Sequence, residues 1–325
     1  MADTKPIDVL VYGLGGIGSF YAFILSRSEQ VRLTVVARSN YDAVKSKGLK
    51  LLSQNHGEHD VKPHKVVRTP AEAGVTFDFV VCAHKAIDQA SVPDQIAPAV
   101  DETKTTLVII QNGVGNEEPF RQRFPSATIL SCVTWVGASQ PEPGVVKHTQ
   151  SEDMQIGLFP NASRDKSSEE QRLEEFAALL RHGNTIFQVV PNIQVQRWEK
   201  VVWNAAWNSL TTLTLMTTHD WLSSSEDAMP MTRRLMTEVI DVARKCDVPL
   251  QYGLIDQLIN KILAMPPIGS SMQADYKNGR PMEVDIILGY PVRKAKELGI
   301  PAPTIETIYT ILKAVNLRLT RGCLL

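Results

Sequence analysis

The sequence predicts an α/β domain over residues 1–190, built on a mostly parallel sheet, followed by an all-helical domain over residues 191–325. Three observations predict this fold class. The chain has 325 residues, about twice the length of a typical domain. Short β-branched, apolar segments alternate with segments long enough for helices in the first part, which is typical of a parallel sheet covered on both faces. From about residue 192 the strand pattern gives way to helical periodicity.

Each element follows from a local pattern. Five apolar runs predict the central strands, at 7–12, 31–37, 77–83, 106–111 and 128–135. Weaker runs at 144–149, 153–159 and 185–190 predict added strands, and 169–182 a helix. In the second part, segments bounded by prolines predict helices at 193–216, 229–246, 252–264, 283–298 and 304–319.

Composition excludes several classes of protein. Lys and Arg number 34 against 35 Asp and Glu, and the net charge of -1 argues against a nucleic-acid or membrane-surface partner. No apolar run reaches the ~18 residues of a membrane span, and the strand starting at Ile7 leaves no room for a targeting peptide. Four widely spaced cysteines lack a zinc-ligand pattern, and His56 and His59 read as surface residues. We therefore expect a cytosolic protein with a small-molecule partner and no metal.

A glycine motif follows the first predicted strand directly. It reads Gly13-Leu14-Gly15-Gly16-Ile17-Gly18, and an amphipathic helix follows it. In a dinucleotide site the first glycine permits a tight turn, the second lets the backbone approach a diphosphate, and the third lets helix and strand pack closely. The alternative is a flexible turn. With a strand before it and a helix after it, the motif favours a Rossmann-type dinucleotide site.

The end of the second predicted strand indicates which dinucleotide binds. An NAD site usually has an acidic residue there, whereas this chain has Arg38, followed by Ser39 and Asn40. A guanidinium binds phosphate bidentately, so Arg38 favours the 2′-phosphate of NADP. The alternative is an arginine that only covers the strand end at the surface.

The segment 195–213 carries the most informative pattern for catalysis. Lys200, Asn204 and Asn208 follow one another at intervals of four, which places them on one helix face with a drift of ~40° per step. A solvated polar stripe is the simpler interpretation. The surrounding residues are largely apolar and include tryptophans, which favours a buried helix that lines a cleft. A half-buried lysine has a lowered pKa, so Lys200 is a candidate general acid for reducing a carbonyl.

These motifs together resemble the ketopantoate reductase (2-dehydropantoate 2-reductase) family over nearly the whole chain. The resemblance rests on GLGGIG at 13–18, Arg38, HKA at 84–86, QNGVGNEE at 111–118, GASQPEPGVVKH at 137–148, WEKVVWNAAWNSLTT at 198–212, SMQADYKNGRPMEVD at 271–285 and ELGIPAPTIET at 297–307. It implies NADPH-dependent reduction of 2-dehydropantoate to (R)-pantoate, in the pathway to pantothenate and coenzyme A. It also implies a helical domain similar to the C-terminal domain of 6-phosphogluconate dehydrogenase.

The resemblance also implies roles for individual residues. Lys200 matches the proton donor, and the substrate-binding positions match Asn112, Asn204, Asn208 and Ser271. The cofactor-binding positions match the glycine motif, Arg38, Lys85, Asn112, Ala138 and Glu283.

Three functions remain open from the sequence. The first is the NADPH-dependent reductase of 2-dehydropantoate. The second is a reductase of another 2-oxo acid on the same scaffold, such as a hydroxy-acid or opine-type dehydrogenase. The third is a non-enzymatic NADP-sensing protein. Helices 229–246 and 304–319 offer faces for a homodimer, although such faces pack equally well within a domain.

Overall fold

The structure is a computed structural model that describes residues 5–321. The chain divides into two compact units. The first runs to Gln111 and resumes over Asn116–Ile193, and the second combines the short segment Asn112–Gly115 with the chain from Gln194 onward. The predicted classes are confirmed, because the first unit is α/β with a mostly parallel sheet and the second is all-helical.

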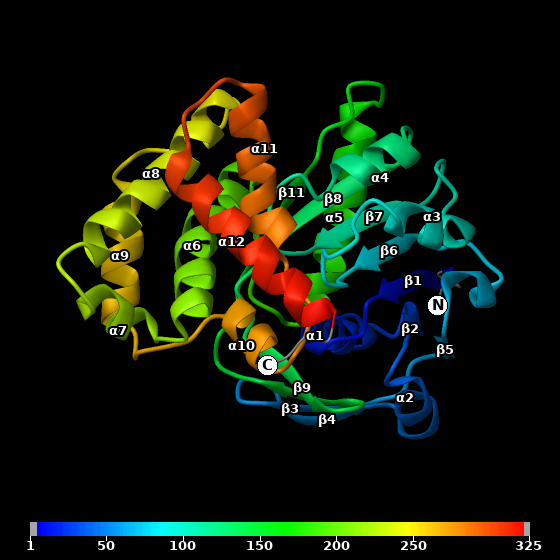
Figure 1. The fold of residues 1–325 in the computed structure, drawn as a ribbon. Coiled ribbons are helices and arrows are strands. Elements are labelled where there is room, and N and C mark those ends of the chain that lie inside the picture. The colour runs from blue at the N-terminus through cyan, green and yellow to red at the C-terminus, as the bar shows by residue number, and fades with distance from the viewer. Residues whose placement is uncertain (1–4, 322–325) are drawn as a thin grey trace. The chain divides into compact units, whose positions relative to one another are not determined.

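The first unit is built on an eight-stranded sheet (Figure 1). Six neighbouring strands are parallel to one another, and two further strands, which run antiparallel to these six, extend the sheet at one edge. In spatial order the strands are β12 (Gln188–Val189), β11 (Met154–Leu158), β8 (Thr128–Thr134), β7 (Thr106–Ile110), β6 (Phe79–Cys82), β1 (Ile7–Tyr12), β2 (Val31–Val36) and β5 (Lys65–Val67). All five predicted central strands are in this sheet.

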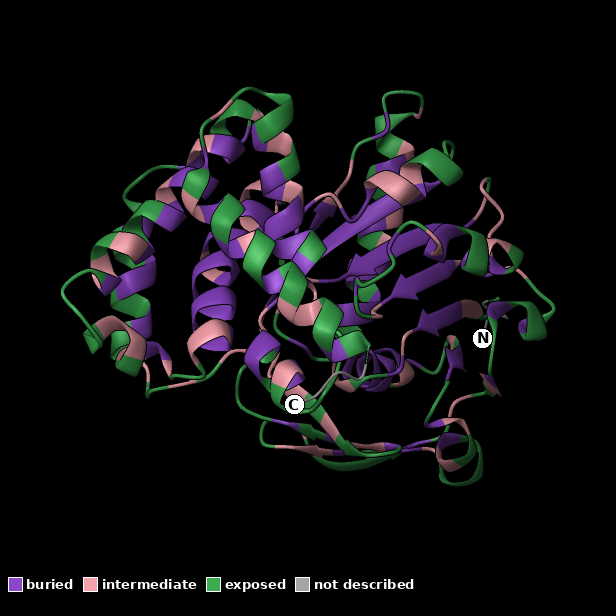
Figure 2. Cartoon of the chain, in the orientation of Figure 1, coloured by how far each residue is buried: buried purple, intermediate pink, exposed green. Residues whose placement is uncertain are grey.

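Each face of this sheet packs against its own helices. Side chains alternate along β1, so Val9 and Val11 enter one apolar core and Leu10 and Tyr12 the other. Figure 2 shows the central strands as almost wholly buried. The first core includes residues of α1 (Gly16–Ser26) and α5 (Lys166–His182), and the second those of α3 (Val92–Ile96) and α4 (Glu118–Arg123).

A second sheet of four strands packs against α1. Its order is β4 (Gly57–Val61), β3 (Leu49–Ser53), β10 (Val145–His148) and β9 (Ala138–Glu142), and α2 (Tyr41–Lys47) precedes β3. Of these strands only β10 was predicted, as an added strand. Leu49, Leu51 and Val146 join the first core, so this sheet extends it past α1.

His56 differs from its sequence-based expectation. Its side chain is only 6% exposed, and the ring nitrogen Nε2 lies 3.0 Å from both carboxylate oxygens of Glu152. Asn55 and Thr185 donate hydrogen bonds of 2.8 and 2.7 Å to the same carboxylate. The polar sequence around His56 therefore forms a hydrogen-bonded cluster around the Glu152 carboxylate, whereas His59 is exposed as expected.

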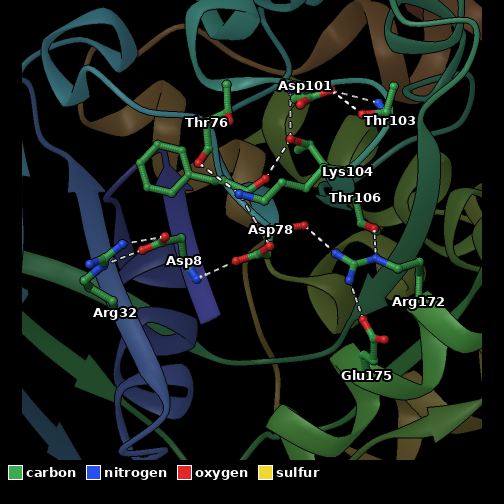
Figure 3. A network of polar contacts seen from close by, with 12 residues as sticks. Asp8, Arg32, Thr76, Asp78, Asp101, Thr103, Lys104, Thr106, Arg172 and Glu175 are labelled. Atoms are coloured by element: carbon green, nitrogen blue, oxygen red, sulfur yellow. Dashed lines mark hydrogen bonds and ion pairs between the residues drawn. The ribbon is translucent and has the colours of Figure 1, made fainter. Parts of the chain in front are cut away.

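The amino ends of the main-sheet strands are joined by a polar network (Figure 3). The Asp78 carboxylate accepts a 2.8 Å hydrogen bond from the backbone of Asp8, whose own carboxylate pairs with Arg32. Arg172 of α5 donates to the Asp78 carbonyl at 2.7 Å and to the Thr106 hydroxyl at 2.8 Å. This network fixes four strand starts to α5, at the edge opposite to the one where parallel sheets bind ligands.

The second unit is helical. It contains α6 (Ile193–Thr214), α7 (Thr218–Ser223), α8 (Ala228–Lys245), α9 (Leu254–Ala264), α10 (Ser271–Lys277), α11 (Tyr290–Glu297) and α12 (Pro303–Thr320). The helix predicted at 283–298 is interrupted by a π-helical turn at Asp285–Gly289. Pro291 follows it, and proline disrupts regular helical hydrogen bonding because it lacks an N–H donor. None of the helices in the described range is long and apolar enough to span a membrane.

The amino terminus of α12 is capped from α8. Both carboxylate oxygens of Glu238, which is 7% exposed, accept backbone hydrogen bonds. The donors are the N–H groups of Thr304 at 3.0 Å and Ile305 at 2.8 Å. A side chain from one helix therefore satisfies two of the first N–H groups of another, which have no partner inside their own helix.

Candidate active site

The glycine motif forms the turn between β1 and α1, and three of its glycines are required by close contacts. Gly13 has a φ of +99°, and a Cβ there would lie 2.3 Å from the backbone nitrogen of His84. A Cβ on Gly18 would lie 1.8 Å from the Gly13 carbonyl oxygen, and one on Gly16 2.6 Å from that of Ala138. Gly15 differs, because a Cβ there would meet no atom within 4 Å. This open position above the start of α1 fits the close approach of a dinucleotide diphosphate.

Two side-chain amides bind the backbone of the motif at Leu14. The carbonyl of Leu14 accepts hydrogen bonds from Asn40 at 2.8 Å and from Gln140 at 3.1 Å, and Asn40 also donates to the amide oxygen of Gln140 at 3.1 Å. The sequence grouped Asn40 with Arg38 at a phosphate site, but its buried amide turns toward the glycine motif instead. Ile17 packs against the first core.

Arg38 lies at the end of β2, where the sequence placed a phosphate-binding group. Its Nη2 hydrogen-bonds to the hydroxyl of Tyr12 and, at 3.1 Å, to Gln95 Oε1, while Tyr12 donates to the same oxygen at 2.6 Å. The guanidinium carbon lies 5.4 Å from the centre of the Tyr12 ring. Within residues 5–321, the remaining nitrogens of Arg38 form no hydrogen bond, so an exposed edge of the guanidinium is held in a defined orientation. Sequence reasoning missed Tyr12 and Gln95.

The other cofactor candidates of this unit follow two strand ends. Lys85 is exposed just after β6, and Ala138 begins β9 with its carbonyl against Gly16. Beside Lys85, burial lowers the pKa of His84 to about 4, so its ring is neutral near pH 7. Gln111 donates a 2.9 Å hydrogen bond to the His84 carbonyl, which fixes this turn next to the glycine motif.

The second group of candidates lies in the helical unit, on α6. Lys200 keeps some exposure as a residue, but protein atoms crowd its ammonium group. This burial lowers the pKa of Lys200 to about 7, the positive charges of Arg197 and Lys261 act in the same direction, and the Glu283 carboxylate opposes them. At this pKa the side chain can both hold and release a proton near neutral pH.

Asn204 and Asn208 follow Lys200 on the same helix. They are 5% and 4% exposed, so the row is not a solvated stripe. The Nδ2 atom of each is buried and has no hydrogen-bond partner within the described part of the chain. A buried N–H group without an acceptor is costly, so these two amides are suited to donate hydrogen bonds to the oxygen atoms of a ligand.

The segment Asn112–Gly115 brings a strand-end residue into the helical unit. Asn112 donates a 3.2 Å hydrogen bond to the carboxylate of Glu283, which itself acts on the charge of Lys200. Arg197, which is 1% exposed, donates at 3.0 Å to the carbonyl of Gly113. Asn112, Glu283 and Lys200 therefore belong to one electrostatic environment, although Asn112 and Glu283 are 171 residues apart.

Ser271 is the exposed first residue of α10. Its neighbour Ser270 caps this helix by accepting a 3.0 Å hydrogen bond from Gln273, and its hydroxyl is hydrogen-bonded at 2.8 Å to that of Thr211 on α6. The start of α10 is thus tied to α6 through Ser270, which sequence reasoning did not select. Among residues 5–321, no three His, Cys, Asp or Glu side chains gather as a metal site would require.

Comparison with known proteins identifies the family. Residues 9–161 match ketopantoate reductase PanE/ApbA, and residues 192–316 match its C-terminal domain. The 2-dehydropantoate 2-reductase of a Nostoc species is 24% identical over 312 residues, which make up 96% of each chain. The crystal structure of 2-dehydropantoate 2-reductase from Methylococcus capsulatus is 30% identical, with a TM-score of 0.86 over 96% of this chain and 98% of that one. The chain belongs to the ketopantoate reductase family.

These matches confirm the family assignment made from the sequence. Members of the ketopantoate reductase family are oxidoreductases that use a nicotinamide cofactor. The fold itself is more widely shared. D-mandelate dehydrogenase, solved with NADH and anilino(oxo)acetate, is 21% identical and has a TM-score of 0.85 over 97% of this chain and 100% of that one.

Proposed function

We propose that this member of the family reduces 2-dehydropantoate to (R)-pantoate with NADPH, as a step toward pantothenate. The observation that carries the proposal is Lys200, a lysine whose pKa lies at about 7, on a helix face that also holds two buried amides without partners. A group that exchanges its proton near pH 7, beside unsatisfied donors, is what the reduction of a polar ketone requires.

The chain's residues divide the work of a carbonyl reduction. The bound dinucleotide supplies the hydride that adds to the ketone carbon. Lys200 donates its proton to the ketone oxygen, which becomes the hydroxyl group of the product. Before transfer, its ammonium group stabilises the negative charge that develops on that oxygen. Glu283 favours the charged form of Lys200, so it helps to keep the donor protonated.

Polar side chains of the helical unit position the substrate. The Nδ2 groups of Asn204 and Asn208 are donors for substrate oxygens, and binding would satisfy both of them. Asn112, oriented by Glu283, and Ser271 complete the proposed substrate contacts.

The α/β unit binds the dinucleotide in this proposal. The open side of Gly15 receives the diphosphate, next to Leu14, Ile17 and the other glycines of the motif. Arg38 binds the 2′-phosphate that distinguishes NADP from NAD. The family resemblance assigns the remaining cofactor contacts to Lys85 and Ala138 of this unit and to Asn112 and Glu283 of the helical unit.

A spectrophotometric substrate panel tests the proposal. Wild-type protein is assayed with NADPH and NADH against 2-dehydropantoate, pyruvate and benzoylformate, and Lys200→Ala is assayed in parallel. We expect the highest kcat/KM with NADPH and 2-dehydropantoate. Loss of the proton donor should lower kcat by about 10²–10⁴-fold while the Kd for NADPH changes less than about twofold.

Two outcomes would contradict the proposal. Near wild-type kcat in Lys200→Ala would show that Lys200 is not the proton donor, and a protein that binds NADPH without reducing any 2-oxo acid would favour the NADP-sensing alternative.

A higher kcat/KM with benzoylformate would favour an aromatic 2-oxo acid as the substrate. The Trp203 and Trp207 rings, in edge contact with centres 5.9 Å apart, are the observation that supports this second candidate.

A further inference from the structure

Trp207 of α6 has a buried indole N–H group without an acceptor. The residue is 2% exposed, and no atom within residues 5–321 accepts a hydrogen bond from its Nε1. Two other tryptophans show the usual arrangement, because Trp221 donates to Thr232 at 2.9 Å and Trp135 donates to Gln155 at 3.2 Å. Buried indole N–H groups normally find a partner, so Trp207 is an exception that requires an explanation.

The position of Trp207 on the helix relates it to the candidate active site. At 100° per residue it lies about 20° to one side of Lys200, while Asn204 and Asn208 lie about 40° and 80° to the other side. Lys200 and the three unpartnered N–H groups therefore share an arc of about 100° on one face of α6.

The indole is also held in place. The ring of Trp203 contacts it nearly perpendicularly, at an interplanar angle of 79°. One turn further along, the Thr211 hydroxyl lies 2.6 Å from the Trp207 carbonyl oxygen and 2.8 Å from the Ser270 hydroxyl at the start of α10. An orphan donor on a fixed ring is a preorganised binding group, because little conformational entropy is lost when an acceptor arrives.

The distance along the helix indicates which part of a substrate Trp207 can reach. Seven residues correspond to a rise of about 10 Å from Lys200, and Asn204 lies between them. Because helical side chains lean toward the helix amino terminus, the indole extends back along α6 toward Lys200, where its ring contacts that of Trp203. A donor in this place reaches the end of a bound 2-oxo acid that is remote from the reacting carbonyl.

We propose that Trp207 is a specificity-determining residue whose indole N–H donates a hydrogen bond to an oxygen at the remote end of the substrate. This role rests on the proposed reductase function and adds a substrate requirement to it. Substrates with an acceptor at that end, such as the 4-hydroxyl group of 2-dehydropantoate, satisfy the donor, whereas apolar analogues leave it buried and unsatisfied. A site built to bond such a group discriminates against analogues that lack it.

A matched pair of substrates and a matched pair of variants test the role. The substrates are 2-dehydropantoate and 3,3-dimethyl-2-oxobutanoate, which has the same carbon skeleton without the 4-hydroxyl group. The variants are Trp207→Phe and Trp221→Phe, each of which removes an indole N–H and keeps an aromatic ring. Trp207→Phe should lower kcat/KM for 2-dehydropantoate about tenfold, mainly through KM, and change that for the analogue less than about twofold. Trp221→Phe should change neither by more than about twofold.

Thermal unfolding without ligand gives a readout that does not depend on catalysis. Trp207→Phe removes an unsatisfied buried donor, so the Tm of this variant should lie between that of wild type and a value about 2 °C higher. Trp221→Phe removes a satisfied hydrogen bond and should lower the Tm.

Each failure has a distinct signature. Equal losses with both substrates, or a lowered Tm in Trp207→Phe with unchanged kinetics, would show that Trp207 acts by packing alone and would overturn its role while leaving the reductase intact. A wild-type protein that neither reduces nor binds either substrate would overturn the proposed function together with this role.

Discussion

The protonation state of Lys200 controls which direction of the proposed reaction is fast. Its pKa is lowered from 10.5 to about 7, chiefly by burial. Reduction needs the protonated amine as donor, so kcat/KM for reduction should fall as pH rises above about 7, tenfold per pH unit at most. Oxidation of the hydroxy acid needs the neutral amine, so its rate should rise as the pH increases through about 7 and level off about one pH unit above it. Initial rates in both directions between pH 6 and 10 measure this, and a reduction rate that stays constant up to pH 9.5 would contradict the assignment.

Arg38 should determine the preference for NADPH. Arg38→Ala removes a guanidinium that Tyr12 and Gln95 hold in place, and with it a charge-assisted bond to the 2′-phosphate. Because such bonds contribute about 1.5–3 kcal/mol, the KM for NADPH should rise roughly 10- to 100-fold, while that for NADH stays within about twofold. Arg32→Ala is the control, because Arg32 is at the other end of β2 and pairs with Asp8. Similar losses with both cofactors would indicate a structural role for Arg38.

At the scale of elements, the cap on α12 joins two helices of the helical unit through a buried carboxylate. Glu238→Ala leaves the N–H groups of Thr304 and Ile305 without their buried acceptor, which should lower the free energy of unfolding by about 1–3 kcal/mol. Glu306→Ala on α12 is the control, since the Glu306 pair with Lys296 is solvent-exposed and such pairs contribute about 0–1 kcal/mol. Urea unfolding of both variants measures the difference. Equal losses would indicate that the cap contributes no more than a surface pair.

The elements that could be predicted are those with a local signal. The main-sheet strands are continuous apolar runs because both of their faces are buried, and the glycine motif and the row from Lys200 to Asn208 are encoded within one turn or one helix. The four-stranded sheet gave little signal. In β4, four of five residues are exposed, and β9 contains Pro141, so neither shows the alternation on which strand prediction depends.

The parts of the candidate site that escaped prediction depend on distant pairing. Tyr12 and Gln95 meet Arg38 from elements 26 and 57 residues away. The unsatisfied N–H group of Trp207 is visible only after every neighbouring acceptor has been placed. Sequence spacing identifies which side chains share a face, but it does not show which of them lack partners.

At the scale of the whole molecule, the division of the chain is not a single cut. The chain enters the helical unit at Asn112, returns to the α/β unit after Gly115, and leaves it again after Ile193. Within the helical unit, Gly113 is fixed by Arg197, and a Cβ on Gly115 would lie 2.0 Å from the Tyr290 ring. These four residues are therefore an integral part of the helical unit.

The membership of Asn112–Gly115 in the helical unit sets a rule for recombining this protein with its relatives. A hybrid protein joined once, near residue 193, would take residues 112–115 from one parent and the helices that contact them from the other. The joint would then separate Asn112 from its own Glu283, and Gly115 from its own Tyr290. To exchange substrate preference between relatives, residues 112–115 should therefore be transferred together with the chain from residue 194 onward.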